Sequence, residues 1–227
     1  GSDVPERLAL PFTGEYLQIA RITFSPFSSL WEGVRDIFQE WYLGERIFIE
    51  VYARKPRLPG KKGLIEDEKP LLDISKIRDA LNKLSGKGWG LGIATGRPFS
   101  ELYLPLKKMG IWNCFDADSI VTYDDVCKAE EHLRGCFSQK ISLGKPHPFS
   151  FLKSYWGKKL SNIRALSGDG LRPEKGRCWI VGDSMADLLA AREMGALFIG
   201  VLTGHGGVDS GDLFAREGAR AVLADMT

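Results

Sequence analysis

The sequence predicts an α/β fold with a Rossmann-like three-layer core and a parallel sheet. From residue 71 to the end, short apolar runs alternate with helical patterns, which is typical of parallel strands covered on both faces. The chain has 227 residues, 44% of them hydrophobic and 26% charged, as in an ordinary globular protein. This composition excludes a fibrous or wholly disordered chain.

Residues 1–70 have a different, irregular and aromatic-rich pattern. We expect them to form a mostly helical cap or insert ahead of a core at 71–227. Within 30–42, apolar side chains recur on one helical face, and Ser29 with Glu32 offers a capping box at its start. Further elements are a weakly alternating segment at 16–24 that is a candidate strand, and an exposed charged loop or hinge at 55–69.

The core region divides into regular elements. Strands are predicted at 89–95, 120–121, 178–181 and 196–202, and helices at 73–84, 98–109, 148–156 and 185–194. Asp73 is a typical N-cap, and Pro148 is typical of a helix start.

Charge and cysteine usage narrow the function classes. Lys plus Arg is 31 against Asp plus Glu 29, a net charge of +2, which argues against a nucleic-acid binder with its basic stripe. No apolar run approaches the roughly 18 residues of a membrane span. The start lacks a signal-peptide pattern, and Gly1-Ser2 resembles a cloning scar. The four cysteines form no CxxC pair, so we expect free thiols in a cytoplasmic protein. Oligomeric state is not readable from the sequence.

Polar residues follow the predicted strands where each strand ends. Thr95 and Gly96 follow the first, Asp183 and Asp187 follow the third, and Lys145 stands in a proline-rich turn before a helix. Ligands of a parallel sheet lie beyond the carboxyl ends of its strands, so we expect these residues to meet. A hydroxyl beside unpaired amides binds anions, a lysine neutralises a phosphoryl group, and aspartate oxygens suit Mg²⁺.

Each of these residues also has a structural explanation when taken alone. Thr95 and Asp183 fit helix caps, and Lys145 fits a solvated charge. Nearby, Arg97 is expected to be solvated, and the His147 imidazole to orient the backbone near Lys145. A functional explanation is favoured because these residues occur together in order along the chain, with Thr95 and Asp183 each following an apolar strand.

The segments 93–97, 144–148 and 182–187 resemble the second, third and fourth motifs of the haloacid dehalogenase (HAD) superfamily, the aspartate-nucleophile phosphatases. The resemblance extends over roughly 70–225 and is closest to phosphoglycolate-phosphatase-like members. It implies a Rossmann-like core, Mg²⁺ as cofactor, and transfer of the substrate phosphoryl group to an aspartate.

The resemblance also implies roles for the candidate residues. Thr95, with Gly96, would bind the phosphoryl oxygens. Lys145 would steady the nucleophile and the phosphate charge. Asp183 would bind Mg²⁺, and Asp187 would support that metal site.

The family's first motif, an apolar strand ending Asp-x-Asp-Gly, is not found in this chain. In one explanation it is degenerate, with Ser25 at the nucleophile position and Phe27 at the acid position. In the other, the chain begins after the motif and residues 1–70 belong to the cap. Loss of that central strand would expose two strand edges and leave a slot in the core.

Two functions are therefore carried forward. The first is a Mg²⁺-dependent phosphatase that acts on a small phosphorylated metabolite through an aspartyl-phosphate in the intact protein, this chain being inactive as it stands. The alternative is a catalytically dead HAD-like pseudoenzyme that serves as a binding or assembly module. A nucleotide-binding protein of another kind is disfavoured, because Gly90-x-Gly92 does not continue as GxGxxG.

Overall fold

The structure, a computed structural model, describes residues 29–137, 141–204 and 206–226. The chain falls into two compact units, residues 1–68 and 69–227. The described helices include none that is both long and apolar enough to span a membrane.

The first unit is built on one bent helix. Helix α2, Ser29–Tyr52, bends at Gly44, where φ is 73°. The chain then folds back on it through the short 3₁₀ helix η2, Leu64–Asp67. Gly44 and Lys62 form an antiparallel bridge, and the Glu45 amide donates to the Lys61 carbonyl at 2.9 Å. The helix predicted at 30–42 is thus confirmed and longer, and the segment predicted as a loop is fixed on it.

Acidic side chains hold this returning segment. Glu40, only 2% exposed, accepts hydrogen bonds at Oε2 from the amides of Arg57 (2.9 Å) and Leu58 (3.3 Å). Asp36 pairs with Arg54 at 2.6 Å and with Arg35 at 3.2 Å. Burial opposes ionisation of Asp36, but hydrogen bonds from Arg54 and Arg35 outweigh it and lower the pKa of this carboxyl.

The apolar face predicted on residues 30–42 forms, but it stays open to solvent. Five side chains on it are between 43% and 54% exposed: Leu30, Val34, Ile37, Phe38 and Trp41. Among the described residues of this unit, the buried apolar side chains come instead from the end of α2 and from η2: Leu43, Ile47, Phe48 and Ile65. Periodicity located the face, but it could not say whether another segment would cover it.

The second unit alternates helices and strands. Its helices are α3 (Ile74–Gly86), α4 (Phe99–Lys108), α5 (Tyr123–Cys136), α6 (Phe149–Trp156), α7 (Asn162–Ser167), α8 (Met185–Met194) and α9 (Asp209–Arg216). Its strands are β1 (Ile93–Ala94), β2 (Ile120–Val121), β3 (Trp179–Gly182), β4 (Leu197–Val201) and β5 (Ala221–Leu223). Two 3₁₀ turns, η3 (Trp112–Cys114) and η4 (Ala117–Ser119), precede β2.

The strand pairs in the described part of the chain are all parallel, which confirms the α/β class. β1 pairs with β2, with Ile93 opposite Ile120, and β3, β4 and β5 form a second ladder, with Ile180 opposite Phe198. In the described part of the chain, β1 pairs with β2 alone and β3 with β4 alone, so each keeps one open edge.

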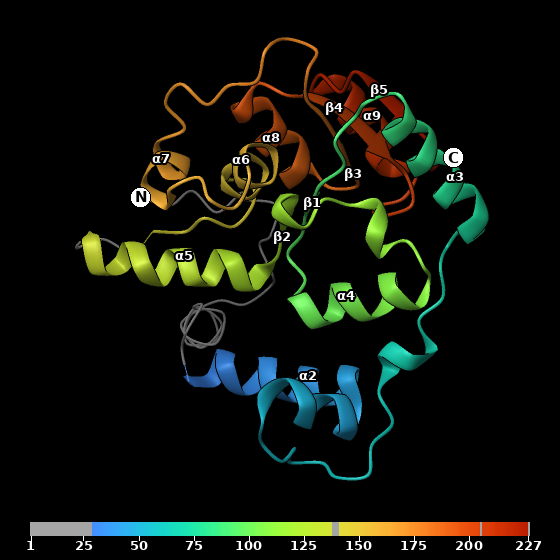
Figure 1. Cartoon of the computed structure of the whole chain (residues 1–227), viewed down its shortest axis with the longest axis vertical. Helices are drawn as coiled ribbons and strands as arrows, with labels where there is room; N and C mark the ends of the chain where they lie inside the picture. Colours follow the sequence, from blue (N-terminus) through green and yellow to red (C-terminus); the bar gives the residue numbers. More distant parts are fainter. Residues whose placement is uncertain (1–28, 138–140, 205, 227) are drawn as a thin grey trace, which may run out of the picture. The chain divides into compact units, whose positions relative to one another are not determined.

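The two ladders nevertheless share a core. Helix α6 packs on β1 and β2 and also against α8, which itself packs on β3 and β4 (Figure 1). Ala94 of β1 packs against the same buried cluster as Ile180, Leu188 and Phe198. The opposite side of β3 is open, with Trp179 39% and Val181 48% exposed.

Local signals explain most helix starts. The Asp73 carboxylate accepts from the Ser75 amide at 2.8 Å and caps α3 as predicted. Helix α8 has the predicted bounds. Helix α5 was not predicted, although Thr122 and Asp125 form a capping box at its start. Strand β1 has two residues where seven were predicted; among the described residues, β2 is its one partner strand.

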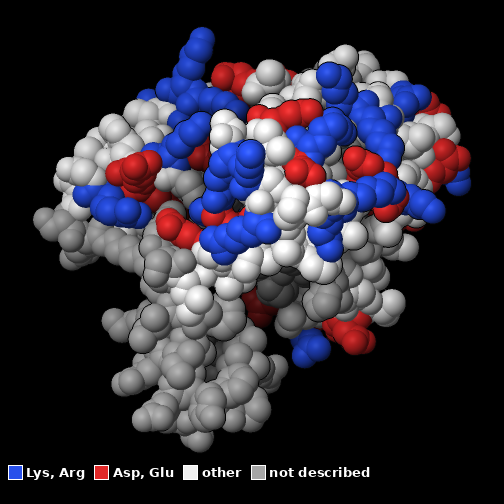
Figure 2. All heavy atoms as spheres, turned by 90° about the horizontal axis from the view of Figure 1, so that it is seen from below, with Lys and Arg blue, Asp and Glu red and all other residues white. Residues whose placement is uncertain are grey.

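Surface charge is mixed in sign. Figure 2 shows Lys and Arg interspersed with Asp and Glu over the described surface on that side. This agrees with the net charge of +2.

Candidate functional site

The carboxyl ends of β1 and β3 are joined through Lys145. Its Nζ donates to the Ala94 carbonyl at 2.9 Å and to Asp187 Oδ1 at 2.7 Å. The side chains of Lys145 and Asp187 are 23% and 8% exposed, so the ion pair is largely buried. Three segments far apart in sequence therefore meet near the ends of β1 and β3.

Asp187 also lies in the first turn of helix α8, where it forms a capping box with Ser184. Its Oδ2 accepts from the Ser184 hydroxyl (2.6 Å) and amide (3.2 Å), and its own amide donates to Ser184 Oγ. A Cβ on Gly182 would lie 2.7 Å from Asp187 Cβ, so only glycine lets the end of β3 approach so closely. Both carboxylate oxygens of Asp187 are thus engaged by protein donors.

Asp183 brings a further loop to this edge. It follows β3 directly, is exposed, and lies against Gly204 in the loop after β4, where any Cβ would overlap its carboxylate. Among the described residues, no hydrogen bond or ion pair engages the Asp183 carboxylate. Its oxygens are therefore open to a cation.

Thr95 and Gly96 begin the loop after β1. The Thr95 amide extends the ladder to the Val121 carbonyl at 2.9 Å, and Thr95 Oγ1 accepts from the Arg97 amide at 3.1 Å. Gly96 is exposed, with open space where a Cβ would stand. Lys145 binds the carbonyl of Ala94, and Thr95 is the next residue in the chain.

Two neighbours of Thr95 are already paired. Arg97 lies 3.6 Å from the buried carboxylate of Glu101, so it is not simply solvated as expected. The Phe99 amide at the start of α4 donates to Asp124 Oδ2 at 2.7 Å. A protein carboxylate thus occupies that amide, and it is not available to a substrate anion.

His147 shapes the turn that carries Lys145. Its Nδ1 accepts from the Phe149 amide at 3.1 Å, and its own amide donates to the Gly144 carbonyl at 3.0 Å. Burial lowers the pKa of His147, opposed in part by the charge of Glu193. A neutral imidazole therefore orients the backbone at the start of α6.

The donor set fits Mg²⁺ only in part. Within residues 29–137, 141–204 and 206–226, no group of three His, Cys, Asp or Glu is placed to hold a metal. Mg²⁺ commonly takes only one or two protein carboxylates and keeps its waters. Asp183 can be one of these, whereas the oxygens of Asp187 are held by Lys145 and Ser184. Ser25, Phe27 and the segment 16–24 lie outside the described residues.

Sequence reasoning missed Ser184 and Gly204. The spacing of Ser184 and Asp187 is that of a capping box, a readable signal. No local signal connects Gly204 to Asp183, because their approach depends on the pairing of β3 with β4.

Comparison with known proteins finds a family similarity for the C-terminal part of the chain. Residues 142–227 match the family model described as HAD-hydrolase-like. No curated protein matches the chain. An X-ray structure of a structural-genomics target is 36% identical with a TM-score of 0.77, over 89% of this chain and 52% of its own. The present chain thus spans about half the length of that protein.

Two other solved structures are less similar. One is a Thermotoga maritima protein provisionally described as a beta-phosphoglucomutase, with 21% identity, a TM-score of 0.44, and coverage of 64% of this chain and 53% of its own. The other is a hydrolase from Pseudomonas syringae, with 26% identity, a TM-score of 0.42, and coverage of 65% and 55%. The family match itself includes Lys145, Asp183 and Asp187, so residues 142–227 resemble a HAD-like hydrolase domain.

Proposed function

We propose that this chain supplies the phosphate-binding and metal-binding edge of a Mg²⁺-dependent HAD-type phosphatase acting on a small phosphorylated metabolite. The observation that carries the proposal is the bridge from Lys145 to Ala94 and Asp187. It holds a cation between the ends of β1 and β3, where a ligand of a parallel sheet is expected.

Lys145 and Thr95 each keep one donor for a phosphoryl group. An ammonium has three N–H donors, and two of those on Lys145 go to Ala94 and Asp187. Thr95 Oγ1 accepts from the Arg97 amide, which leaves its hydroxyl hydrogen to donate. Gly96 leaves room for the anion beside them. Asp183 would hold Mg²⁺, which supplies charge neutralisation at the phosphoryl group when bound.

The nucleophile comes from outside the described residues. In the proposed reaction an aspartate oxygen bonds to phosphorus, the bond to the leaving oxygen breaks, and water then cleaves the aspartyl-phosphate. Of the two carboxylates at this edge, Asp187 is held by Lys145 and Ser184, and Asp183 is assigned to the metal. We infer that the chain is inactive alone and that a further strand, between the open edges of β1 and β3, brings the nucleophile in the intact protein.

A pseudoenzyme is the second candidate. The same observation favours it, since both carboxylate oxygens of Asp187 are engaged by protein donors. In that case residues 16–27 would complete the fold without a carboxylate, and Ser25 and Phe27 would occupy the catalytic positions.

The test compares hydrolysis of p-nitrophenyl phosphate with Mg²⁺ by the chain alone and by the chain extended upstream with an apolar strand ending Asp-x-Asp-Gly. We expect background rates from the first and a gain of several orders of magnitude from the second. Asp183→Asn in the extended protein should abolish the gain, while Asp79→Asn, an exposed change on α3, should not.

The outcomes separate the two candidates. Robust Mg²⁺-dependent turnover by the unextended chain, lost on Asp183→Asn, would refute the inferred inactivity. A folded extended protein without turnover would favour the pseudoenzyme.

A further inference from the structure

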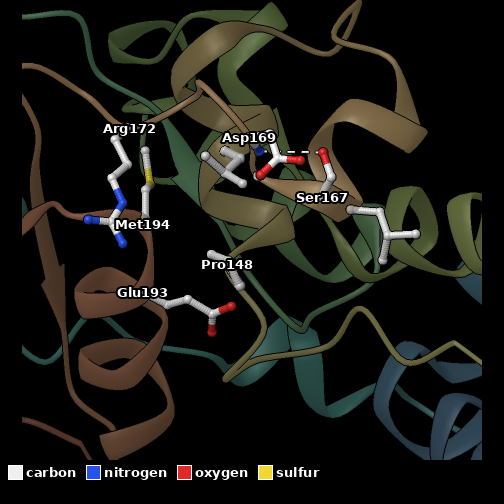
Figure 3. Close-up of a pocket in the computed structure, with 9 residues that line it drawn as sticks. Pro148, Ser167, Asp169, Arg172, Glu193 and Met194 are labelled. Carbon is white, nitrogen blue, oxygen red and sulfur yellow. Dashed lines mark hydrogen bonds between the residues drawn. The ribbon is translucent and has the colours of Figure 1, made fainter.

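A pocket of about 210 Å³ opens in the second unit. Its walls come from the start of α6, the connection between α7 and β3, and the end of α8 (Figure 3). Thr95, Lys145, Asp183 and Asp187 do not line it. It is smaller than the roughly 300–1,000 Å³ of sites for drug-sized ligands, so it suits a small metabolite.

The inner wall of the pocket is apolar. Leu152 and Met194 are each 2% exposed, Pro148 is buried, and Leu166 lies beside them. These side chains can take up a short hydrocarbon group. Burial of that group would contribute about 25 cal/mol per Å² of apolar surface removed from water.

The mouth carries charges of both signs. Asp169, Arg172 and Glu193 line it and are exposed. Within the described part of the chain, none of the three forms an ion pair. Figure 3 shows the Asp169 and Glu193 carboxylates on either side of Pro148, and Arg172 beside Met194. Two carboxylates and one guanidinium make the lining net negative, which disfavours a phosphate and suits an ammonium.

The wall that presents Asp169 is preformed. Gly168 ends α7 in a left-handed conformation, with φ 69°, and its amide donates to the Arg164 carbonyl at 2.9 Å. The Leu171 amide closes the same turn on the Gly168 carbonyl at 3.2 Å. A ligand would therefore find the carboxylate without ordering a loop, a saving in conformational entropy.

We propose that this pocket binds a free α-amino acid with an apolar side chain. Arg172 pairs with its carboxylate through a planar, bidentate guanidinium. Asp169 and Glu193 receive its ammonium, and the apolar wall takes its side chain. The proposal is independent of the phosphatase reaction, because it uses none of that site's residues.

Isothermal titration calorimetry of the full chain with L-leucine, L-methionine and L-valine tests this. We expect one saturable site for at least one of them. N-acetylation of that amino acid, which removes the ammonium, and methyl esterification, which removes the carboxylate, should each weaken binding by about tenfold or more. Because these changes are made in the ligand, they do not depend on the folding of a variant.

Two variants locate the site. Arg172→Ala should weaken binding of the amino acid by about tenfold or more and leave its methyl ester unchanged. Arg192→Ala, an exposed arginine that pairs with Glu217 outside the pocket, is the matched control and should bind normally. The proposal is overturned if none of the three amino acids gives saturable heat, if the blocked ligands bind as well as the parent, or if folded Arg172→Ala binds undiminished.

Discussion

The two units of this chain are stabilised by different means. In the first, buried carboxylates hold a returning segment onto α2 beside a small apolar core, and Glu40 alone binds two backbone amides. In the second, large apolar clusters carry the fold, and the buried ion pair of Lys145 and Asp187 lies at the candidate site. Buried polar groups thus hold the returning segment in one unit, and in the other a buried ion pair lies at the candidate site.

The largest effect is expected from the second unit's apolar core. Phe149 is fully buried in a cluster with Leu133 and Leu143. Phe149→Ala should lower the free energy of unfolding by about 3–5 kcal/mol, because it leaves a cavity. Chemical denaturation measures this, and Leu71→Ala, at a side chain 80% exposed, should change it by less than about 0.5 kcal/mol. If Phe149→Ala and Leu71→Ala lowered the free energy of unfolding equally, the second unit would not depend on its apolar core.

Next comes the ion pair at the candidate site. Lys145→Met leaves Asp187 buried without its cation. Since Lys145 is 23% exposed, the loss should fall below the roughly 3–5 kcal/mol of a fully buried pair. Adding Asp187→Asn should cost less in this background than in the wild type, and a double-mutant cycle measures that coupling. Strict additivity would mean that the pair contributes nothing to stability.

In the first unit a single carboxylate should matter by itself. Glu40→Gln weakens the acceptor of the Arg57 and Leu58 amides, and we expect a loss of about 1–3 kcal/mol. Hydrogen exchange of those two amides should accelerate while amides of the second unit stay unchanged. Glu50→Gln, at a side chain 62% exposed, is the control.

The smallest effects on stability are expected from changes in pH, and the two units should respond to them in different pH ranges. The lowered pKa of His147 means that the unfolded chain binds a proton first, so the second unit should lose stability as pH falls below about 6.5 toward the folded pKa. Protonation at Nδ1 would also remove the acceptor of the Phe149 amide. Denaturation at pH 7 and pH 5.5 should show this loss, and His147→Asn should abolish it.

Asp36 affects the stability of the first unit in a more acidic pH range than His147 does for the second unit. Its lowered pKa stabilises the first unit above the ordinary value of 3.8, and this stability is lost only as pH falls through the lower folded pKa. Hydrogen exchange should therefore show the second unit weakening first in mild acid. Loss of protection in the first unit between pH 7 and pH 5.5 would contradict this order.

Sequence patterns predicted those elements of the second unit whose signals are local, and they missed α5, α7, α9 and β5. The Asp73 cap and the span Met185–Met194 follow from residues within one helix. The exposure of the apolar face of α2 depends on what covers it, which periodicity cannot supply. We expected Asp187 to support a metal site, and its ion pair with Lys145 was not predicted, because a carboxylate near a metal and one that binds a lysine look alike in sequence.

Within the described part of the chain, β1 and β3 each have one edge without a partner strand, which has a consequence for handling the protein. Unpaired strand edges are templates for pairing with other chains. At high concentration the isolated polypeptide should self-associate through these edges, and a short peptide that inserts between them should act as a solubilising agent. The degree of self-association in solution would then report whether a peptide occupies the space between these edges, before any turnover assay is run.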